Sequence, residues 1–565
     1  MKVVARMLGS LLTAVVLSGC VTANMAQLDK NELGPPAQST PRGEAMGRYI
    51  ASVFLERTGN MEAALEELEK VPALDRTAVT PSLRLIRTYV RAQEFEKARD
   101  LAETTAEQLS DNPAIWIMLG EIYHQLKQFD KAIEAFSKAV KLNPENVHGY
   151  GALAEVLEAT NDLVAALDSY ETLVKMNPNS APLQFQLGAT LIRINDREGA
   201  RVAFQKALEL NPGFSQARYM LGILDLELDR NEDCVAALSQ HLDQHPGDVR
   251  SVESLVGALG RLQRFDEALT RLQGIGKDAW QPKHEIIRAF LQLQAGRAAE
   301  AEQTSLTGAP IFGTIMRQLA KQAQGKPVEP AVDSLDAIDS DVDEEASANL
   351  NDITYLFGKE KGAAWLAERL ATLQQGAPTS RVLSLVRSRM LYSLERFDEG
   401  VALLEPLYTA ETSDKTLLFY LADGNEKRKR YDEAEKYLKR YLELDPANPE
   451  MLNFLGFMYA DKNMKLDEAE VLIRKALETD PDNAYYLDSL GWVFYRQGKG
   501  KQAIEYIQRA IYGMSSDDAI LRDHLGDAYF LDGQVEKAVA EWKRARRLDP
   551  KLPGVQEKLD KHGAK

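Results

Sequence analysis

The fold is decided by a stretch that recurs along the chain. It begins as Trp116-Ile-Met-Leu119-Gly120-Glu-Ile-Tyr123 and continues through Ala132, Phe136 and Pro144. Steps of 34 residues from Gly120, Ala132 and Pro144 reach further small residues and prolines: Ala154, Gly188 and Gly222; Ala166, Ala200, Cys234 and Ala268; Pro178, Pro212 and Pro246. A fixed period of this length indicates a solenoid, because each unit is too small to bury its own apolar face and must stack on its neighbours.

The C-terminal third repeats the pattern in steps of 34 or 35. Its members are Gly456, Gly491 and Gly526; Ala434, Ala469, Ala503 and Ala538; Pro446 and Pro481. Small residues let two helices approach closely, aromatics such as Tyr123 and Phe494 fill the space between units, and proline stops the second helix. The pattern resembles the tetratricopeptide (TPR) repeat. We therefore predict an all-α TPR helix-turn-helix solenoid, a right-handed superhelix of about thirteen helix pairs in two blocks.

Composition excludes several classes of protein. The 565 residues carry a net charge of −17, which argues against binding to the nucleic-acid phosphate backbone. Two cysteines exclude a disulfide scaffold and a cysteine-rich zinc module. A mean hydropathy of −0.32 excludes a protein with many membrane spans.

The first residues have the layout of a secretory signal. Lys2 and Arg6 precede an apolar run over 7–17, and Leu17-Ser18-Gly19-Cys20 closes it. This last stretch resembles a bacterial lipobox, which implies a signal peptide over 1–19, acylation of Cys20 and a flexible tether over 20–42. Val21 is not the aspartate that retains such proteins in the inner membrane, so the resemblance implies an outer-membrane anchor on the periplasmic face. An ordinary signal peptide with an incidental Cys20 is the alternative.

We expect two solenoid blocks, over 43–324 and 346–565, separated by an acidic linker. The segment 325–345 holds Pro327, Pro330 and a run of acids from Asp333 to Glu345. The alternative is a decorated loop within one continuous solenoid.

Candidate chemistry is sparse. His241 and His245 are four residues apart, as metal ligands on one helix face can be, but they fall at a packed slot and a pre-proline loop slot. Cys234 takes a small-residue slot and is expected to be a buried, inert thiol. The basic run Lys427-Arg428-Lys429-Arg430 falls in a turn between helices, where charges are readily solvated. No phosphate loop, nucleophile elbow or zinc-protease motif occurs. We predict a protein that is not an enzyme and binds no metal, cofactor, nucleic acid or small-molecule substrate.

A partner is expected in the groove formed by the first helix of each pair. Helical periodicity places groove-facing side chains six and three residues before the Gly slot, and one, four and five after it. In the C-terminal units these positions hold Asn453, Phe457, Tyr485, Asp488, Trp492, Tyr495, Arg496, Asp523, Asp527 and Phe530. Aromatics beside polar groups are typical of a recognition surface, and the aspartates favour a basic partner. The alternative is that these residues pack against the next unit or a capping helix.

The stretch from Leu452 to Pro550 resembles the end of a group of proteobacterial outer-membrane TPR lipoproteins. One member of that group is the adaptor of a periplasmic carboxyl-terminal processing protease. The resemblance implies a lipid-anchored scaffold that binds protein or peptide partners of the envelope and presents substrates to a protease. A scaffold for polysaccharide export or envelope assembly is the alternative.

Overall fold

The computed structural model describes residues 40–304, 310–327, 342–376, 378, 380–514 and 516–563. Within these residues the chain is helical throughout and has no strand, as the repeat pattern predicts. The predicted signal peptide, Cys20 and most of the tether lie outside the described residues, as does the middle of the predicted linker. None of the described helices is both long and apolar enough to cross a bilayer.

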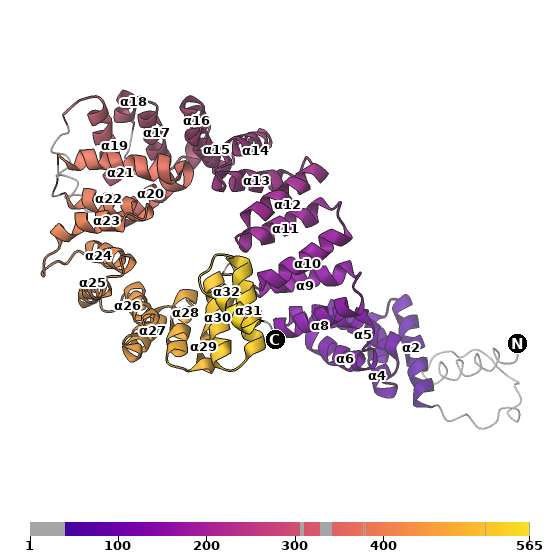
Figure 1. The fold of residues 1–565 in the computed structure, drawn as a ribbon. Helices are drawn as coiled ribbons and strands as arrows, with labels where there is room; N and C mark the ends of the chain where they lie inside the picture. The colour runs from indigo at the N-terminus through magenta and orange to yellow at the C-terminus, as the bar shows by residue number, and fades with distance from the viewer. Residues whose placement is uncertain are drawn as a thin grey trace, which may run out of the picture. The chain divides into compact units, whose positions relative to one another are not determined.

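The chain divides into two compact units, residues 1–176 and 177–565 (Figure 1). The described helices of the first unit are α2 (Pro41–Arg57), α3 (Met61–Glu69), α4 (Val71–Leu74), α5 (Val79–Arg91), α6 (Phe95–Gln108), α7 (Pro113–Gln125), α8 (Phe129–Leu142), α9 (Val147–Ala159) and α10 (Leu163–Met176). Consecutive helices pack in pairs, and a core that runs from Leu68 to Ala166 joins them.

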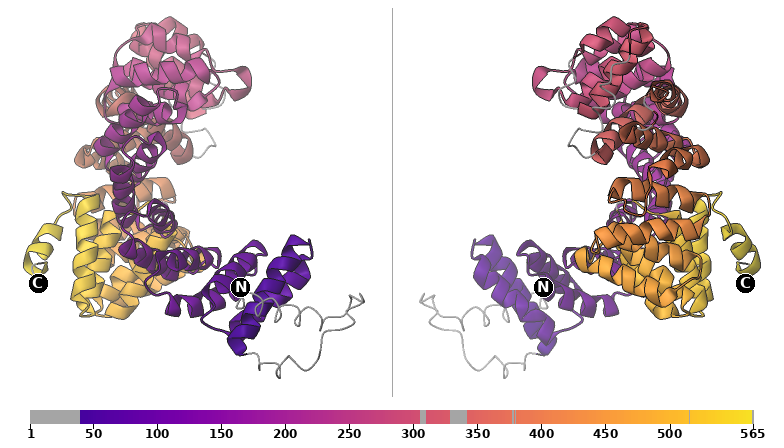
Figure 2. Two further views of the ribbon diagram at one scale, coloured as in Figure 1. Left: turned by 90° about the vertical axis from the view of Figure 1, so that its right-hand side faces the viewer. Right: turned by 90° about the vertical axis from the view of Figure 1, so that its left-hand side faces the viewer.

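The second unit continues the pairing. It begins with α11 (Ala181–Arg193), α12 (Arg197–Leu210), α13 (Ser215–Glu227), α14 (Asn231–Gln244), α15 (Val249–Arg261), α16 (Phe265–Leu272), α17 (Pro282–Gln294), α18 (Ala298–Gln303) and α19 (Pro310–Ala323). It goes on through α20 (Val342–Gly358), a π-helical turn (Lys359–Ala364), α21 (Trp365–Gln374), α22 (Arg381–Ser393), α23 (Phe397–Leu404), α24 (Lys415–Lys427) and α25 (Tyr431–Leu444). The last pairs, clearest in Figure 2, are α26 (Pro449–Asp461), α27 (Leu466–Thr479), α28 (Ala484–Arg496), α29 (Gly500–Gly513), α30 (Ala519–Leu531) and α31 (Val535–Leu548), followed by α32 (Val555–His562).

The glycine slot of the first helix and a large side chain of the second helix depend on each other. A Cβ at Gly120 would lie 2.7 Å from the Phe136 ring, and one at Gly526 would lie 2.5 Å from the Trp542 ring. Glycine therefore leaves the space that a large side chain of the second helix fills, which is aromatic here but Leu238 at Gly222 and Ile473 at Gly456. This close approach is the physical reason for the repeat pattern.

Each turn inside a pair uses one left-handed residue, which the sequence pattern does not reveal. These residues also follow the period of 34: Gln93, Lys127, Asn161, Asn195, Asp229 and Gln263, with φ between 57° and 63°. A left-handed residue just after a helix lets the chain reverse within a short turn. Lys429 is the corresponding residue of the basic run, and Arg428 beside it pairs with Asp398 at 2.7 Å. The run thus lies in a turn, as expected.

The structure divides the chain at a different place from the predicted linker. Helices from both sides of 325–345 belong to the second unit, and α20 already begins at Val342. This helix packs on α15, α17 and α19, and its Leu350 and Ile353 share one buried core with Ile311 and Phe312. Helices before and after the run of acids and prolines bury apolar side chains against one another. This run therefore does not mark the division between the two units.

Candidate partner-binding groove

The predicted groove residues lie on α26, α28 and α30, the first helices of the last three pairs. The structure places them at very different depths. Tyr485 and Phe530 are exposed to 65% and 39%, whereas Asp488, Trp492 and Asp527 are buried. The half-buried members are Asn453, Phe457, Tyr495, Arg496 and Asp523.

Trp492 is covered by its own neighbours. The His524 ring lies 3.9 Å from it, tilted by 19°, and the Tyr495 ring lies 4.7 Å from it, tilted by 21°. The Arg496 guanidinium lies 4.7 Å from the Trp492 ring centroid. Trp492 is therefore part of a stacked cluster that joins α28 to α30, and its ring faces are not free to hold a partner.

His524, which is not among the predicted groove residues, pairs with the buried Asp488. Its Nδ1 lies 3.1 Å from both carboxylate oxygens of Asp488. Burial alone would lower the pKa of His524, but the surrounding carboxylates, led by that of Asp488, outweigh it and raise the pKa above its usual value. The pair ties adjacent repeats together.

Asp523 and Asp527 pair with the last helix of the chain. Lys558 Nζ of α32 lies 2.7 Å from Asp523 and 2.6 Å from Asp527, and Trp542 Nε1 donates to Asp527 at 3.0 Å. Burial raises the pKa of Asp527, although Lys558 opposes this. Phe530 lies 4.5 Å from the His562 ring of the same helix. These contacts are of the capping kind that we held as the alternative. Because Lys558 already pairs with the carboxylates of Asp523 and Asp527, their charge gives little reason to expect a basic partner.

Three groove side chains keep a buried polar atom without a hydrogen-bond partner in the described structure. They are Asn453 Oδ1, Trp492 Nε1 and Arg496 Nε. Arg496 is otherwise fixed, since its Nη2 donates to the carbonyl of Asp461 at the end of α26 at 3.1 Å. Similar atoms occur elsewhere in the described chain, for example Gln128 Oε1 and Gln318 Oε1, but these three lie at predicted groove positions of α26 and α28.

A second stretch of groove, over α15 and α17, was not predicted as a site. Stepping 34 residues on from Gly222 reaches Val256, so the slots one, four and five after it hold Gly257, Gly260 and Arg261. Here α20 lies directly on the helix surface. Two glycines at groove slots were the signal that could have indicated a closely packed occupant.

The side chains considered for chemistry are structural. His241 is buried, with Nδ1 3.0 Å from Ser215 Oγ and Nε2 3.3 Å from Asp248. In the described parts of the chain, no three His, Cys, Asp or Glu side chains converge as metal ligands. Cys234 is fully buried, and burial raises the pKa of its thiol to about 12, so it stays protonated.

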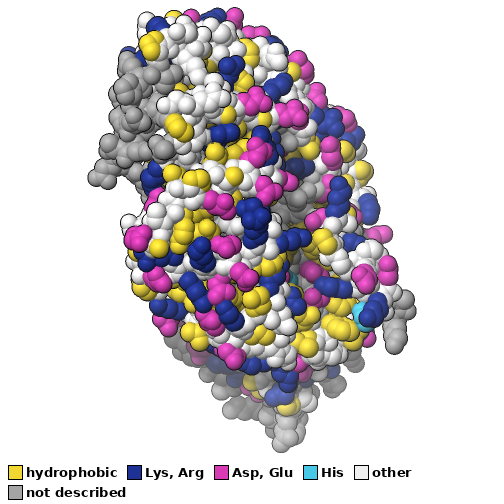
Figure 3. Space-filling view, turned by 60° about the vertical axis from the view of Figure 1, so that its left-hand side comes forward, with side chains coloured by type: hydrophobic (Ala, Val, Ile, Leu, Met, Phe, Trp, Pro, Cys, Tyr) yellow, Lys and Arg dark blue, Asp and Glu magenta, His cyan; other side chains and the backbone are white. Residues whose placement is uncertain are grey.

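Charged side chains of both signs are interspersed over the face of the molecule in Figure 3. The basic side chains there do not form a continuous stripe of the kind that follows a nucleic-acid backbone.

Comparison with known proteins supports the repeat assignment. Family models described as tetratricopeptide repeat match residues 113–146, 191–259, 385–449 and 425–492. The sequence matches no curated protein.

Among solved structures, YrrB, "a TPR protein with an unusual peptide-binding site", is 24% identical over 31% of this chain and 89% of its own, with a TM-score of 0.28. MamA is 21% identical over 34% of this chain and 96% of its own, with a TM-score of 0.28. The structure of Naa15/Naa10 bound to HypK-THB matches 86% of this chain and 79% of its own at 15% identity and a TM-score of 0.36. The family models thus identify tetratricopeptide repeats in residues 113–146, 191–259 and 385–492 of this chain.

Proposed function

We propose that this protein is a non-catalytic scaffold that captures a protein partner on the surface formed by α26 and α28. The observation that supports this most directly is the set of unsatisfied atoms Asn453 Oδ1, Trp492 Nε1 and Arg496 Nε. An unpaired buried polar atom costs roughly 1–3 kcal/mol, so a ligand that satisfies these atoms gains binding energy.

The atoms suit a polypeptide backbone. Trp492 and Arg496 offer N–H donors to a carbonyl, and Asn453 offers an acceptor to an amide N–H. Tyr485, exposed to 65%, supplies an apolar surface at the same helix. Because the three polar atoms are shielded from solvent, small side-chain rotations accompany binding.

The test compares partner capture by the natural chain and by Arg496→Gln. Tagged protein is incubated with solubilised envelope, and bound proteins are quantified by mass spectrometry. Arg509→Gln is the matched control, since Arg509 lies on α29 and pairs with Asp482 at 3.5 Å outside the groove. Loss of the same partners in both variants, or in neither, contradicts the site.

We also propose that Cys20 is acylated and that the scaffold is anchored to the outer membrane, facing the periplasm. Support comes from the sequence Leu17-Ser18-Gly19-Cys20 followed by Val21. The mass of the native protein tests it: a chain that begins at Cys20 and carries acyl chains is expected. Cys20→Ala should release the protein from the membrane fraction, whereas Cys234→Ala should not.

For the pathway, we propose presentation of substrates to a periplasmic processing protease, with polysaccharide export or envelope assembly as the second candidate. The resemblance of 452–550 to adaptor lipoproteins supports the first. Capture of a protease together with cell-wall hydrolases, lost in Arg496→Gln, supports it; capture of export or assembly components supports the second.

A further inference from the structure

The helix α20 lies on the groove slots of α15 with almost no clearance. A Cβ at Gly257 would lie 2.7 Å from the carbonyl oxygen of Leu356, and one at Gly260 would lie 2.5 Å from the Phe357 ring. Glycine at 257 leaves room for the backbone of α20, and glycine at 260 leaves room for the Phe357 ring. In this repeat, the slots at which a partner is predicted in the C-terminal repeats therefore hold a segment of the chain itself.

The groove recognises the end of α20 through its backbone. Arg261, the last residue of α15, donates to the carbonyls of Leu356 at 2.8 Å and Tyr355 at 2.5 Å. Gln294, the last residue of α17, donates to the carbonyl of Lys361 at 3.0 Å, and Lys361 in turn donates to the carbonyl of Arg261.

The last carbonyls of a helix have no partner within the helix. Gly358, at φ 78°, ends α20 at this point and leaves them open to Arg261. Contacts to backbone carbonyls accept many sequences, because every residue supplies one.

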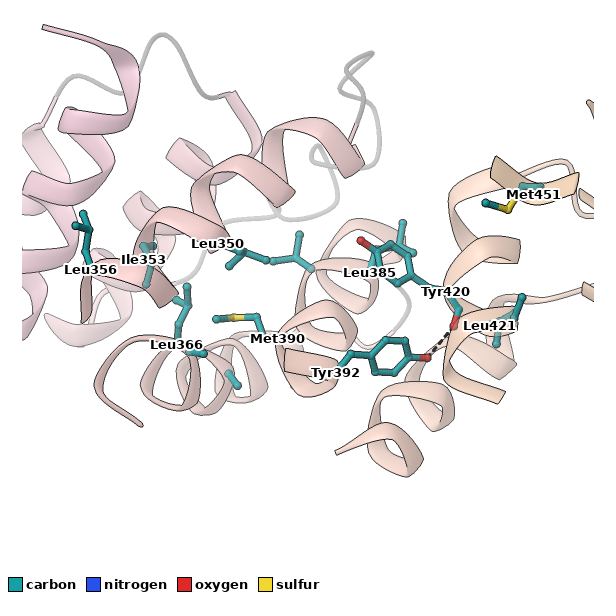
Figure 4. Close-up of a cluster of buried hydrophobic side chains, with 14 of the residues drawn as sticks. Leu350, Ile353, Leu356, Leu366, Leu385, Met390, Tyr392, Tyr420, Leu421 and Met451 are labelled. Carbon is teal, nitrogen blue, oxygen red and sulfur yellow. Dashed lines mark hydrogen bonds between the residues drawn. The ribbon is translucent and has the colours of Figure 1, made fainter. Parts of the chain in front are cut away.

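Phe357 forms the apolar part of this contact. Phe357 lies 4.6 Å from the Phe290 ring of α17. A pocket of about 180 Å³ that is partly open to the surface lies beside it, lined among others by Gly260, Phe265 and Trp365. In Figure 4, Leu350, Ile353 and Leu356 lie in a row along α20, with Leu366 and Met390 of the following helices below them in the same buried core. The helix α20 therefore also packs on the helices after it.

We infer that the groove over α15 and α17 is a helix-binding site, that α20 is its resident ligand, and that an amphipathic helix of the same pattern supplied by another molecule takes its place when α20 is released. The pattern is a large apolar pair, as at Leu356 and Phe357, immediately before a helix end whose carbonyls reach Arg261. This site is separate from the proposed surface on α26 and α28 and does not depend on it.

The test supplies the helix in trans. The probe is a fluorescein-labelled synthetic peptide of residues 342–364, and its anisotropy is measured against the full chain. In the variant Leu356→Asp with Phe357→Asp, the resident helix is weakened and the groove is untouched. We expect the peptide to bind this variant at least about tenfold more tightly than the natural chain, since the resident helix competes at high effective concentration. Tyr355→Asp is the matched control, because Tyr355 is 46% exposed, and it should bind like the natural chain.

Adding Gly257→Leu to the double variant should abolish binding, because leucine fills the space of the helix backbone. Equal binding to the natural chain and the double variant, or to the variant with Gly257→Leu, overturns the inference.

If circular dichroism shows that the double variant is unfolded, the same peptide is added in excess to the natural chain and hydrogen exchange is measured. Faster exchange at 348–358 with unchanged exchange in α26 and α28 supports the site. Unchanged exchange at 348–358 overturns it.

Discussion

Two stretches of groove in the second unit use the same repeat slots in opposite ways. On α15 the positions one and four after Val256, which stands at the Gly slot, are Gly257 and Gly260, and α20 fills the groove down to the backbone at Gly257. On α28 the corresponding slots are Trp492 and Tyr495, whose rings stack and fill that space themselves. The slot five after is arginine in both.

The two arginines differ in what remains unpaired. Arg261 donates to Leu226 of the preceding first helix at 2.8 Å and to two carbonyls of α20. Arg496 donates in the same way to Asp461 of its preceding first helix, but its Nε has no partner in the described structure. In both helices, one hydrogen bond to the preceding first helix fixes the arginine, and its remaining N–H groups can bind an occupant of the groove. The sizes of the side chains one and four after the Gly slot determine how closely that occupant approaches.

The largest expected effect comes from filling the glycine contact. Gly257→Leu should destabilise the second unit by roughly 3 kcal/mol, because the side chain overlaps the backbone of α20. Chemical unfolding followed by circular dichroism measures this. Gly151→Leu is the control, since a Cβ there has no neighbour within 4 Å; a similar loss in the control would mean that leucine in a helix, and not the contact, is responsible.

Removal of the arginine that holds α20 should cost less. Arg261→Ala leaves the carbonyls of Leu356, Tyr355 and Leu226 without this donor, and we expect a loss of about 2 kcal/mol in the free energy of unfolding. Arg261→Lys should recover part of it, because lysine keeps the charge but lacks the fork of N–H groups. Equal stability of Arg261→Lys and the natural chain would argue against backbone recognition.

The corresponding change on α28 should separate binding from stability. Arg496→Gln loses the hydrogen bond to Asp461 and the cation–π contact with Trp492, so the free energy of unfolding should fall by about 1.5 kcal/mol. Partner capture should fall about tenfold if the unpaired Nε serves the partner. Thermal unfolding and quantitative capture together measure the two effects. Trp492→Ala would not separate the effect on binding from the effect on stability, because the Trp492 ring is buried and stacked.

The smallest effect concerns the pair His524 and Asp488. The pKa of His524 is raised in the folded state, so the charged pair stabilises the fold fully below its ordinary pKa of about 6.5 and loses this stabilisation as the pH rises through the folded pKa. His524→Gln should therefore cost more stability at about pH 5.5 than at about pH 9. Unfolding at the two pH values measures the difference; the same cost at both would show that packing alone is lost.

Much of the fold could be predicted because the relevant interactions are local and periodic. The Gly120 and Phe136 slots, the Pro144 stop and the turn position of Arg428 all follow from contacts within one repeat. The partner-binding site stays a prediction, and the contacts around its residues could be predicted only in part. The groove positions of Trp492 and Arg496 follow from helical phase, but the covering of Trp492 by His524 depends on which rotamers two neighbouring repeats adopt together. The pairing of Lys558 with Asp523 and Asp527 depends on how the last helix docks.

By itself, the sequence determined that this chain is a solenoid of helix pairs, since a period of 34 with small, aromatic and proline slots leaves each unit only its neighbours on which to bury its apolar face. Only the tertiary structure decided that the residues around 325–345 do not divide the two compact units, that α20 enters the groove over α15, and that the acids near the C-terminus are paired within the chain. The physical reason is that these contacts join residues up to 100 positions apart, where no repeat period relates one side chain to the other.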